Sequence, residues 1–397
     1  MKRLIAYFKK ETVLCVAMLL GVVSMFLVHP DSQYPEYLDY RTLALLFSLM
    51  TIMEGFKQTG LFGEIAQVLL TRVHTFRQLY LVLVLLCFFC SMWITNDVSL
   101  LTFVPFTILV LELAGLQKEM IPVIVMQTIA ANLGSMMTPV GNPQNLYLYS
   151  VSGMDMGQFL LIMAPLSVLS FLMILGACML HKNFTLDARC LKAGTTFSDT
   201  IPGMQKKGEN SRKDTRKQQN LLLGVLFLIS LLSVFRILSW PVLLLIVLAG
   251  CLCLNSVLHG NFLPKKVDYS LLLTFLAFFI FIGNMKRIDL VRDFLNQMLT
   301  GRELLVSFGC SQVISNVPAA ILLSGFTDQY AALLRGVNIG GLGTLIASLA
   351  SLISYKFFAE KQGQSPKCGT KQRYLLQFTL WNVGMAAVLL LAAFMLS

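Results

Sequence analysis

Charged residues are scarce in this 397-residue chain, and their scarcity excludes most classes of soluble protein. Asp, Glu, Lys and Arg together make up 13% of the sequence, half the share of roughly 25% that soluble globular domains carry. Hydrophobic residues make up 56%, more than a water-soluble domain of this length could bury. A soluble enzyme, a nucleic-acid-binding protein and a disordered chain are therefore excluded. The composition predicts an all-α polytopic membrane protein.

Histidines and nucleotide-binding patterns are equally sparse. The four histidines lie far apart, at positions 29, 74, 181 and 259, so the sequence predicts no metal cluster. The glycine-rich stretch GVNIGGLGT lacks the lysine of a phosphate-binding loop and follows no strand. Neither a Ser–His pair nor a pair of aspartates is found at membrane depth. We therefore expect no enzyme, no resident cofactor and no ATP-driven pump.

Apolar segments dominate what the sequence does contain. Runs of about 17–25 apolar residues are needed to cross a bilayer as a helix. The apolar segments span residues 12–28, 40–56, 79–94, 98–113, 121–150, 157–180, 221–238, 240–258, 268–285, 303–326, 329–355 and 374–396. Two further segments, 61–77 and 288–302, are amphipathic, which is typical of interfacial helices.

Five of the apolar segments do not form single straight helices in this reading. Segments 121–150 and 329–355 are rich in Gly, Asn and Ser, which predicts a helix, a break and a second helix in each. The stretches 79–113 and 303–326 are pairs of apolar arms separated by a polar tip. We expect both to be re-entrant hairpins, so the chain would make about nine full crossings.

The distribution of basic residues predicts an orientation. With the N-terminus in the cytoplasm, 24 of the 31 Lys and Arg residues fall on the inner side, as the positive-inside rule requires. A cytoplasmic-membrane protein with a cytoplasmic N-terminus is therefore expected. The basic linker 182–220 is read as a determinant of topology, with contact to phospholipid as the alternative.

The two halves of the chain resemble each other. Leu38-Asp39-Tyr40 and Val267-Asp268-Tyr269 begin similar spans, 229 positions apart. Each half then continues with an amphipathic stretch, a hairpin, a broken helix and one closing span. An odd number of crossings separates the copies, which predicts inverted repeats. The predicted parts are 1–181 (first inverted repeat), 182–220 (cytoplasmic linker), 221–239 (connecting transmembrane helix) and 240–397 (second inverted repeat).

The breaks and the hairpin tips carry the polar chemistry. Irregular backbone within hydrocarbon is tolerated only where protein or a water-filled cavity covers it, so we expect these four interruptions to meet at the bilayer midplane. The alternative is that small residues merely let helices pack closely. The expected substrate-binding residues are Thr95, Asn96, Asn132, Gly134, Ser135, Thr138, Gly141, Asn142, Ser315, Asn316, Pro318, Asn338, Gly340, Gly341 and Thr344, with Asn145, Gly343 and Ser348 in the same stretches.

Three charged residues lie at or near membrane depth. Asp97 follows Asn96 at the first hairpin tip, and carboxylates inside membranes are costly and commonly functional. We expect Asp97, with Asn96 and Asn316, to bind a coupling cation. Glu54 either acts in the membrane or reaches the interface. Arg335 either faces an anionic substrate or anchors its helix at the surface.

The paired motifs resemble those of the ion transporter superfamily. They are WITNDVSLLTFVPFTILV followed by ANLGSMMTPVGNPQN, and SQVISNVPAAILL followed by GVNIGGLGTLIASLASL. This superfamily includes arsenite permeases, NhaD-type Na⁺/H⁺ antiporters, citrate carriers and divalent-anion/Na⁺ symporters. The sequence is most similar to bacterial anion permeases of the arsenite-permease-like branch, over nearly the whole chain.

The resemblance implies a scaffold domain and an elevator-like transport domain. In the divalent-anion branch, Ser-Asn-Thr at both hairpin tips binds carboxylate and Na⁺. Thr95-Asn96-Asp97 and Ser315-Asn316-Val317 take those places here. Both depart at the third position, where Asp97 and Val317 stand instead of Thr. Asp97 instead resembles the Asn-Asp pair of arsenite-permease-like members.

The expected function is secondary active transport of a small inorganic or organic anion, coupled to Na⁺ or H⁺. The expected partners are the anionic solute and the lipid bilayer, with no nucleic acid. The resemblance also implies that the chain can form a homodimer, since members of this superfamily often do. A Na⁺/H⁺ antiporter and an arsenite-type efflux permease are the alternatives, and a passive channel is a third.

Overall fold

The computed structural model describes residues 11–70, 73–186, 211–256 and 263–396, and these residues are overwhelmingly helical. Within them there is no strand, only one isolated bridge between Thr75 and Thr185. Among the described residues, six helices are long and apolar enough to cross a membrane. They are α5 (Phe76–Ile94), α6 (Asn96–Leu113), α9 (Met156–Met179), the Thr215–Val234 part of α11 (Ser211–Val234), α13 (Tyr269–Lys286) and α19 (Lys371–Met395). The prediction of an all-α polytopic membrane protein is confirmed.

The remaining helices include the predicted amphipathic segments. These are α4 (Leu61–Leu70) and α14 (Asp289–Leu299). The other long helices are α2 (Thr12–Leu27), α3 (Tyr40–Thr59) and α12 (Trp240–Ser256). Short 3₁₀ turns occupy η1 (Tyr34–Tyr37), η2 (Gln117–Glu119), η5 (Leu263–Lys266) and η6 (Pro366–Cys368).

The structure corrects three predicted boundaries. Helix α5 begins at Phe76 rather than at residue 79, because Thr75 and Gln78 form a capping box around its first turn. The predicted amphipathic segment 61–77 is not one continuous helix, because the described helix α4 covers Leu61–Leu70 and residues 73–75 are not helical. Ser211, inside the predicted linker, is already part of helix α11, and Arg216 of this extension forms a 3.0 Å ion pair with Glu64 of α4. Linker residues 187–210 lie outside the described residues.

Both predicted hairpins and both broken helices are present. In the first hairpin α5 and α6 are joined at Thr95, and in the second α15 (Glu303–Ile314) and α16 (Asn316–Leu323) are joined at Ser315. The first broken helix consists of α7 (Met120–Ser135), η3 (Pro139–Gly141) and α8 (Pro143–Ser152). The second consists of α17 (Tyr330–Ile339) and α18 (Leu349–Gln364). We call residues 136–142 the first break and residues 340–348 the second break.

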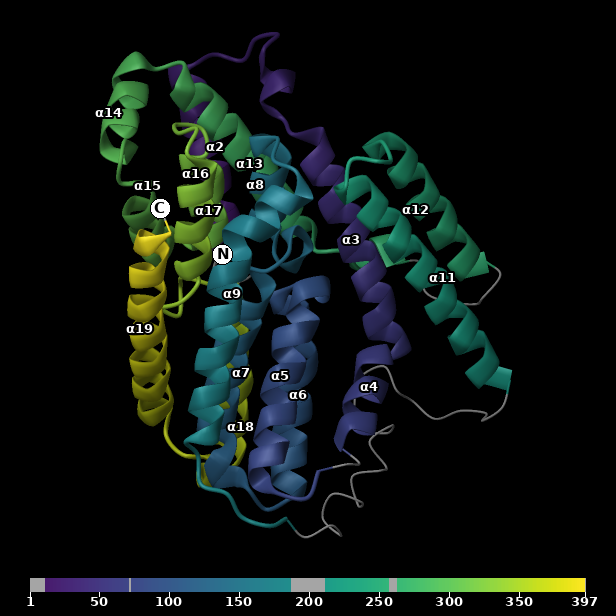
Figure 1. The fold of residues 1–397 in the computed structure, drawn as a ribbon. Helices are drawn as coiled ribbons and strands as arrows, with labels where there is room; N and C mark the ends of the chain where they lie inside the picture. The colour runs from purple at the N-terminus through teal and green to yellow at the C-terminus, as the bar shows by residue number, and fades with distance from the viewer. Residues whose placement is uncertain (1–10, 71–72, 187–210, 257–262, 397) are drawn as a thin grey trace.

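The contacts between the halves are reciprocal. Helix α6 of the first hairpin packs against α18 of the second broken helix, and α16 of the second hairpin packs against α8 of the first. The α5–α6 hairpin and α18 occupy the lower half of the molecule, while α8, α16 and α17 occupy the upper half (Figure 1). The hairpins thus lie toward opposite ends, as inverted repeats require. The repeat boundaries and the course of the hairpins in a bilayer stay predictions.

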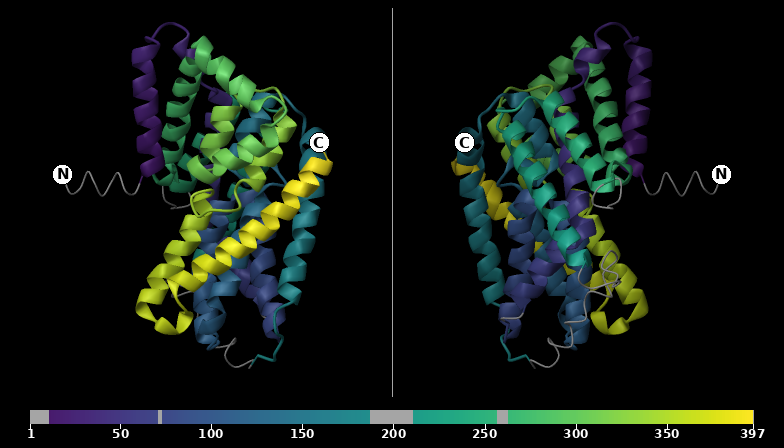
Figure 2. Two further views of the ribbon diagram at one scale, coloured as in Figure 1. Left: turned by 90° about the vertical axis from the view of Figure 1, so that its left-hand side faces the viewer. Right: turned by 90° about the vertical axis from the view of Figure 1, so that its right-hand side faces the viewer.

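A second group of helices lies to one side of this bundle. Helix α3 packs against α11 and α12, and α2 packs along α13. Figure 1 shows α11 and α12 set apart from α5, α7 and α9, and Figure 2 shows α2 beside α13 at the outer edge. Helix α19 runs diagonally across the opposite face in Figure 2, next to α7 and α9.

Close packing of α7 on α5 predicts one stability effect. A Cβ atom added to Gly134 would lie 2.6 Å from Ser91 Oγ, whereas one added to Gly176 of α9 would meet nothing within 4 Å. We expect Gly134→Ala to lower the free energy of unfolding by about 1–3 kcal/mol through overpacking. Gly176→Ala, the control, should be neutral or stabilising by up to about 1 kcal/mol. Thermal denaturation of the detergent-purified protein measures both, and equal midpoints for the two variants would contradict the close contact.

Candidate functional site

The two hairpin tips share an unusual backbone conformation. Thr95 has φ 68° and ψ 151°, and Ser315 has φ 75° and ψ 155°. This region is nearly reserved for glycine and costs about 1–3 kcal/mol for other residues. In the described residues the one other non-glycine residue with positive φ is Arg236. The turn lets α6 and α16 begin directly after α5 and α15 end, with Asn96 and Asn316 as their first residues.

The central asparagine of the first broken helix is held by the second broken helix. Ser348 Oγ donates to Asn132 Oδ1 over 3.0 Å, and Asn132 Nδ2 donates to Ser351 Oγ over 3.2 Å. Asn132 is 4% exposed. Its amide group therefore satisfies a donor and an acceptor from a segment more than 200 positions away.

The central asparagine of the second broken helix is held by the first in the same manner. Asn142 Nδ2 donates to Asn338 Oδ1 over 3.2 Å, and Asn338 Nδ2 donates to Asn145 Oδ1 over 2.6 Å. Asn142 and Asn145 follow Asn132 by 10 and 13 positions, as Ser348 and Ser351 follow Asn338. The two halves thus exchange equivalent hydrogen bonds across their breaks.

Each break is also tied to its own hairpin. The Thr138 hydroxyl donates to the carbonyl of Met92, and Thr344 Oγ1 donates to the carbonyl of Gln312 over 3.1 Å. Met92 and Gln312 each stand four positions before the asparagine of their tip. The threonine hydroxyls then accept from backbone N–H groups three positions on, from Gly141 at 3.1 Å and from Ala347 at 3.2 Å.

The tips and the breaks meet in one cluster. Asn96 Nδ2 donates to Asn132 Oδ1 over 3.0 Å, and Asn132 Nδ2 lies 3.4 Å from the carbonyl oxygen of Gly341. A Cβ on Gly341 would lie 3.1 Å from Asn316 Nδ2. The N–H of Asn316 donates to the carbonyl of Ala347 over 3.0 Å. Residues 96, 132, 316 and 341 are therefore neighbours, and the interruptions meet in one cluster. That this cluster lies at the bilayer midplane stays a prediction.

Two polar groups of the cluster form no hydrogen bond or ion pair with any residue that the structure describes. The carboxylate of Asp97 is partly exposed and has no hydrogen bond or ion pair in the part of the chain that the structure describes. Its backbone N–H donates to Asn96 Oδ1 over 3.0 Å. The Nδ2 group of Asn316, 5% exposed, donates to no described residue either. One tip therefore presents a free carboxylate and the other a free amide donor.

Several predicted binding residues have structural roles here. Gly134 and Gly340 allow α7 and α17 to approach α5 and α15, since a Cβ on either would lie 2.6 Å from the hydroxyl oxygen of Ser91 or Ser311. Ser135 Oγ accepts from Asn142 Nδ2 over 3.2 Å. Pro318 occupies the first turn of α16, where a backbone N–H is not needed. Binding of a solute by these residues stays a prediction.

Two polar residues of the cluster were not singled out from the sequence. One is Ser351. The other is Gln312, whose Nε2 donates to the carbonyls of Gly340 and Leu342 at 2.9 Å each, while its Oε1 accepts from Thr344 N at 3.0 Å. The matched offsets of 10 and 13 positions from the central asparagines would have identified Ser351. Gln312 has no polar counterpart in the first half, where Met92 stands.

Glu54 and Arg335 are bound elsewhere. Glu54 accepts from Gln58 Nε2 at 3.0 Å and lies 3.7 Å from Lys57 Nζ, near the end of α3. Arg335 Nη1 donates to the carbonyl of Leu396 over 3.0 Å. In the described residues no hydrogen bond joins either side chain to the cluster. The structure therefore favours the local, anchoring interpretation of both.

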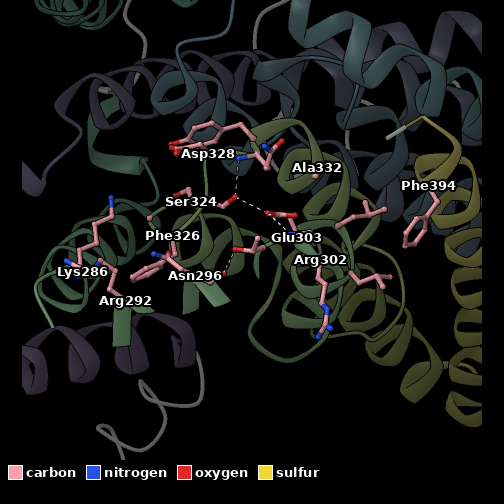
Figure 3. A pocket seen from close by; sticks show the side chains of 18 residues that line it. Lys286, Arg292, Asn296, Arg302, Glu303, Ser324, Phe326, Asp328, Ala332 and Phe394 are labelled. Atoms are coloured by element: carbon pink, nitrogen blue, oxygen red, sulfur yellow. Dashed lines mark hydrogen bonds between the residues drawn. The ribbon is translucent and has the colours of Figure 1, made fainter. Parts of the chain in front are cut away.

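Two pockets lie at opposite ends of the bundle. The α13–α17 pocket has a volume of about 920 Å³ and is lined by Lys286, Arg292, Arg302, Glu303 and Asp328 among others. Figure 3 shows Lys286 and Arg292 on one side of it and Phe394 on the other, with Glu303 between. The α7–α19 pocket, of about 440 Å³, lies at the other end.

Known proteins match this chain over most of its length. The sequence profile described as citrate transporter matches residues 8–350. An uncharacterized transporter of Methanocaldococcus jannaschii is 30% identical over 322 residues, which are 80% of this chain and 81% of that protein. The inner membrane protein YbiR of Escherichia coli is 30% identical over 351 residues, 87% of each chain. A silicon efflux transporter of Oryza sativa subsp. japonica is 32% identical over 170 residues, 42% of this chain and 34% of that protein.

The hydrogen bonds between the two halves predict that the stability losses of variants at Asn145 and Asn338 are coupled. Asn145→Ala and Asn338→Ala each leave a buried polar partner unsatisfied, which costs about 1–3 kcal/mol. Because the two side chains are hydrogen-bonded over 2.6 Å, the double variant should lose less stability than the sum of the single losses, by about 0.5–3 kcal/mol. Thermal denaturation in detergent provides the comparison.

A distant asparagine serves as the control for this cycle. Asn284 of α13 donates to Ser24 and Tyr34 and shares no partner with Asn145. The losses of Asn145→Ala and Asn284→Ala should add to within about 0.5 kcal/mol. Additive losses for the Asn145/Asn338 pair as well would rule out the direct coupling of the two breaks.

Proposed function

The chain belongs to the citrate transporter family, and from this premise we propose that it is a secondary active transporter of a small inorganic or organic anion, coupled to Na⁺ or H⁺. The observation that carries the proposal is the meeting of both hairpin tips and both breaks in one cluster, with a carboxylate and an amide donor left free. The membrane is the cytoplasmic one, with the N-terminus inside.

The helix ends at the cluster supply the charge that an anion needs. Helices α6 and α16 begin there, and α7 and α17 end there. Helix N-termini carry partial positive charge and C-termini partial negative charge. In secondary transporters with discontinuous helices, the helix N-termini bind anionic groups and the helix C-termini coordinate cations. The cluster therefore offers an anion and a cation site side by side.

Asp97 is the residue we assign to the coupling ion. Its carboxylate lies at the start of α6 and is free of protein partners in the described residues. Carboxylate and amide oxygens are ligands that hard cations prefer, and a carboxylate also carries a proton. Asn96 and Asn316 flank the same point and would share in binding. Coupling then follows because the anion site is completed only when the carboxylate is neutralised.

An elevator movement is supported by how the parts are joined. The hairpins and the breaks are tied to one another by the reciprocal hydrogen bonds and form one body. Helix α3 packs mainly with α11 and α12, and α2 with α13, although α3 also contacts α8 and α13 also contacts α16. We propose that the body formed by the hairpins and the breaks moves against α2, α3, α11, α12 and α13. These five helices would be the scaffold. A homodimer, implied by the resemblance, stays a prediction.

Two other transport functions remain as alternatives. The free carboxylate of Asp97 favours a Na⁺/H⁺ antiporter, in which no anion binds. The match to a protein named a silicon efflux transporter, over 42% of this chain, favours export of a small oxygen-rich solute by an arsenite-type efflux permease. Collapse of a pH gradient on addition of Na⁺, without any anion, would select the antiporter.

The assignment of Asp97 predicts a loss of coupling. In proteoliposomes Asp97→Asn protein should still equilibrate the anion but should not accumulate it in response to a Na⁺ or H⁺ gradient, because the amide binds neither ion. The control is Asp293→Asn, on the exposed face of α14, where the side chain is 71% exposed. It should retain full gradient dependence. Unchanged gradient dependence in Asp97→Asn protein would remove Asp97 from the coupling role.

The anion proposal predicts selective stabilisation by ligand. Purified protein should be stabilised by oxyanions or by di- or tricarboxylates, and more strongly when Na⁺ or Li⁺ is present if Na⁺ is the coupling ion. At a ligand concentration of 100 times Kd, the gain is about 2.7 kcal/mol. A thermal-shift series over these anions and cations measures it. Stabilisation by cations with no response to any anion would contradict anion transport.

A further inference from the structure

The α7–α19 pocket contains an excess of positive charge. Its lining includes Lys118, Lys367 and Arg373, from the turn before α7, from η6 and from the first turn of α19. No ion pair to any of the three is formed within the described residues. The one acidic side chain of the lining, Glu119, already lies 3.4 Å from His181 Nε2. Three cations therefore face one pocket of about 440 Å³ without an acidic partner.

The α13–α17 pocket at the other end has a smaller excess of positive charge in its lining. Its cations Lys286, Arg292 and Arg302 are accompanied by Glu303 and Asp328. Arg292 is in addition paired with Asp289 at 2.8 Å and with Asp293 at 3.5 Å. Lys286 and Arg302 also form no ion pair within the described residues, so the two pockets differ in the number of acidic side chains in their linings, two against one. The larger excess of positive charge favours a negatively charged ligand at the α7–α19 pocket.

The wall of the α7–α19 pocket continues onto an exposed apolar surface. Trp381 lines the pocket and is 38% exposed, and on the same helix Leu376 and Leu380 are more than 60% exposed. Helix α9 packs beside α19 and ends in the exposed Leu180. A ligand held here would have a charged end among the cations and apolar chains along α9 and α19. That is the shape of a phospholipid rather than of a small transported solute.

We propose that the α7–α19 pocket binds the phosphate group of an anionic lipid. Phosphate accepts charge-assisted hydrogen bonds from Lys and Arg, the strongest kind that these side chains form. Basic pockets between membrane helices on the cytoplasmic side are suited to anionic headgroups, and the positive-inside count assigns this end to the cytoplasm. The bound lipid bridges α7, α9 and α19. The site is separate from the central cluster and does not depend on the transported solute.

The test compares lipids on the delipidated, detergent-purified full chain. Phosphatidylglycerol should raise the denaturation temperature, whereas phosphatidylcholine with the same acyl chains and inorganic phosphate should not. Lys118→Gln, Lys367→Gln and Arg373→Gln should each weaken the apparent affinity for phosphatidylglycerol about five-fold, since each basic residue near an anionic lipid surface contributes about 1 kcal/mol. Arg373→Lys should retain most of the affinity. Arg302→Gln, a cation of the other pocket, is the matched control and should leave it unchanged.

Three results would overturn the proposal. An equal response to phosphatidylcholine would show that acyl chains alone bind. If inorganic phosphate raised the denaturation temperature as much as phosphatidylglycerol does, free phosphate would be the ligand. An undiminished response in the three Gln variants would remove the pocket from lipid binding. Because the readout is lipid-dependent stability of the protein without any transported anion, failure here leaves the transport proposal untouched.

Discussion

The structure depends on one constraint: helices that break inside hydrocarbon must have their free polar groups satisfied by protein. Here each half satisfies the other. Asn132 is bonded by Ser348 and Ser351, and Asn338 by Asn142 and Asn145. An asparagine amide suits this role because it donates and accepts in one plane. These hydrogen bonds join the two broken helices, so the two halves share a single interior.

The hairpin tips add strain to this arrangement, and the surrounding contacts maintain it. Thr95 and Ser315 share a backbone conformation that glycine would adopt more easily. Ser315 Oγ and the N–H of Asn316 both donate to the carbonyl of Ala347, at 3.3 and 3.0 Å. The second tip is thereby anchored to the second break, and its geometry depends on the position of α18. Strain that persists at two equivalent places is typical of functional sites.

The two halves of the cluster differ in the polar groups that have no hydrogen-bond partner in the described residues. Asn96 donates to Asn132, whereas the Nδ2 group of Asn316 has no partner in the described residues. The position after the tip asparagine is Asp97 in one half and Val317 in the other. Gln312 secures the second break through three hydrogen bonds, and Met92 has only its carbonyl to offer at the equivalent place. A nearly two-fold scaffold thus holds two unlike polar ends.

The sequence by itself determined the helical membrane class, the hairpins, the breaks and the set of polar residues at them, because hydropathy and the preferences of Gly, Pro and Asn act locally along the chain. It misplaced the start of α5 by three residues, since the capping box of Thr75 and Gln78 lies outside the apolar run. Only the tertiary structure decided which asparagine bonds to which serine, that Gly134 and Gly340 serve packing, and that Lys118, Lys367 and Arg373 share a pocket. These facts join positions up to more than 200 residues apart, and such pairings depend on how the helices pack rather than on any local preference.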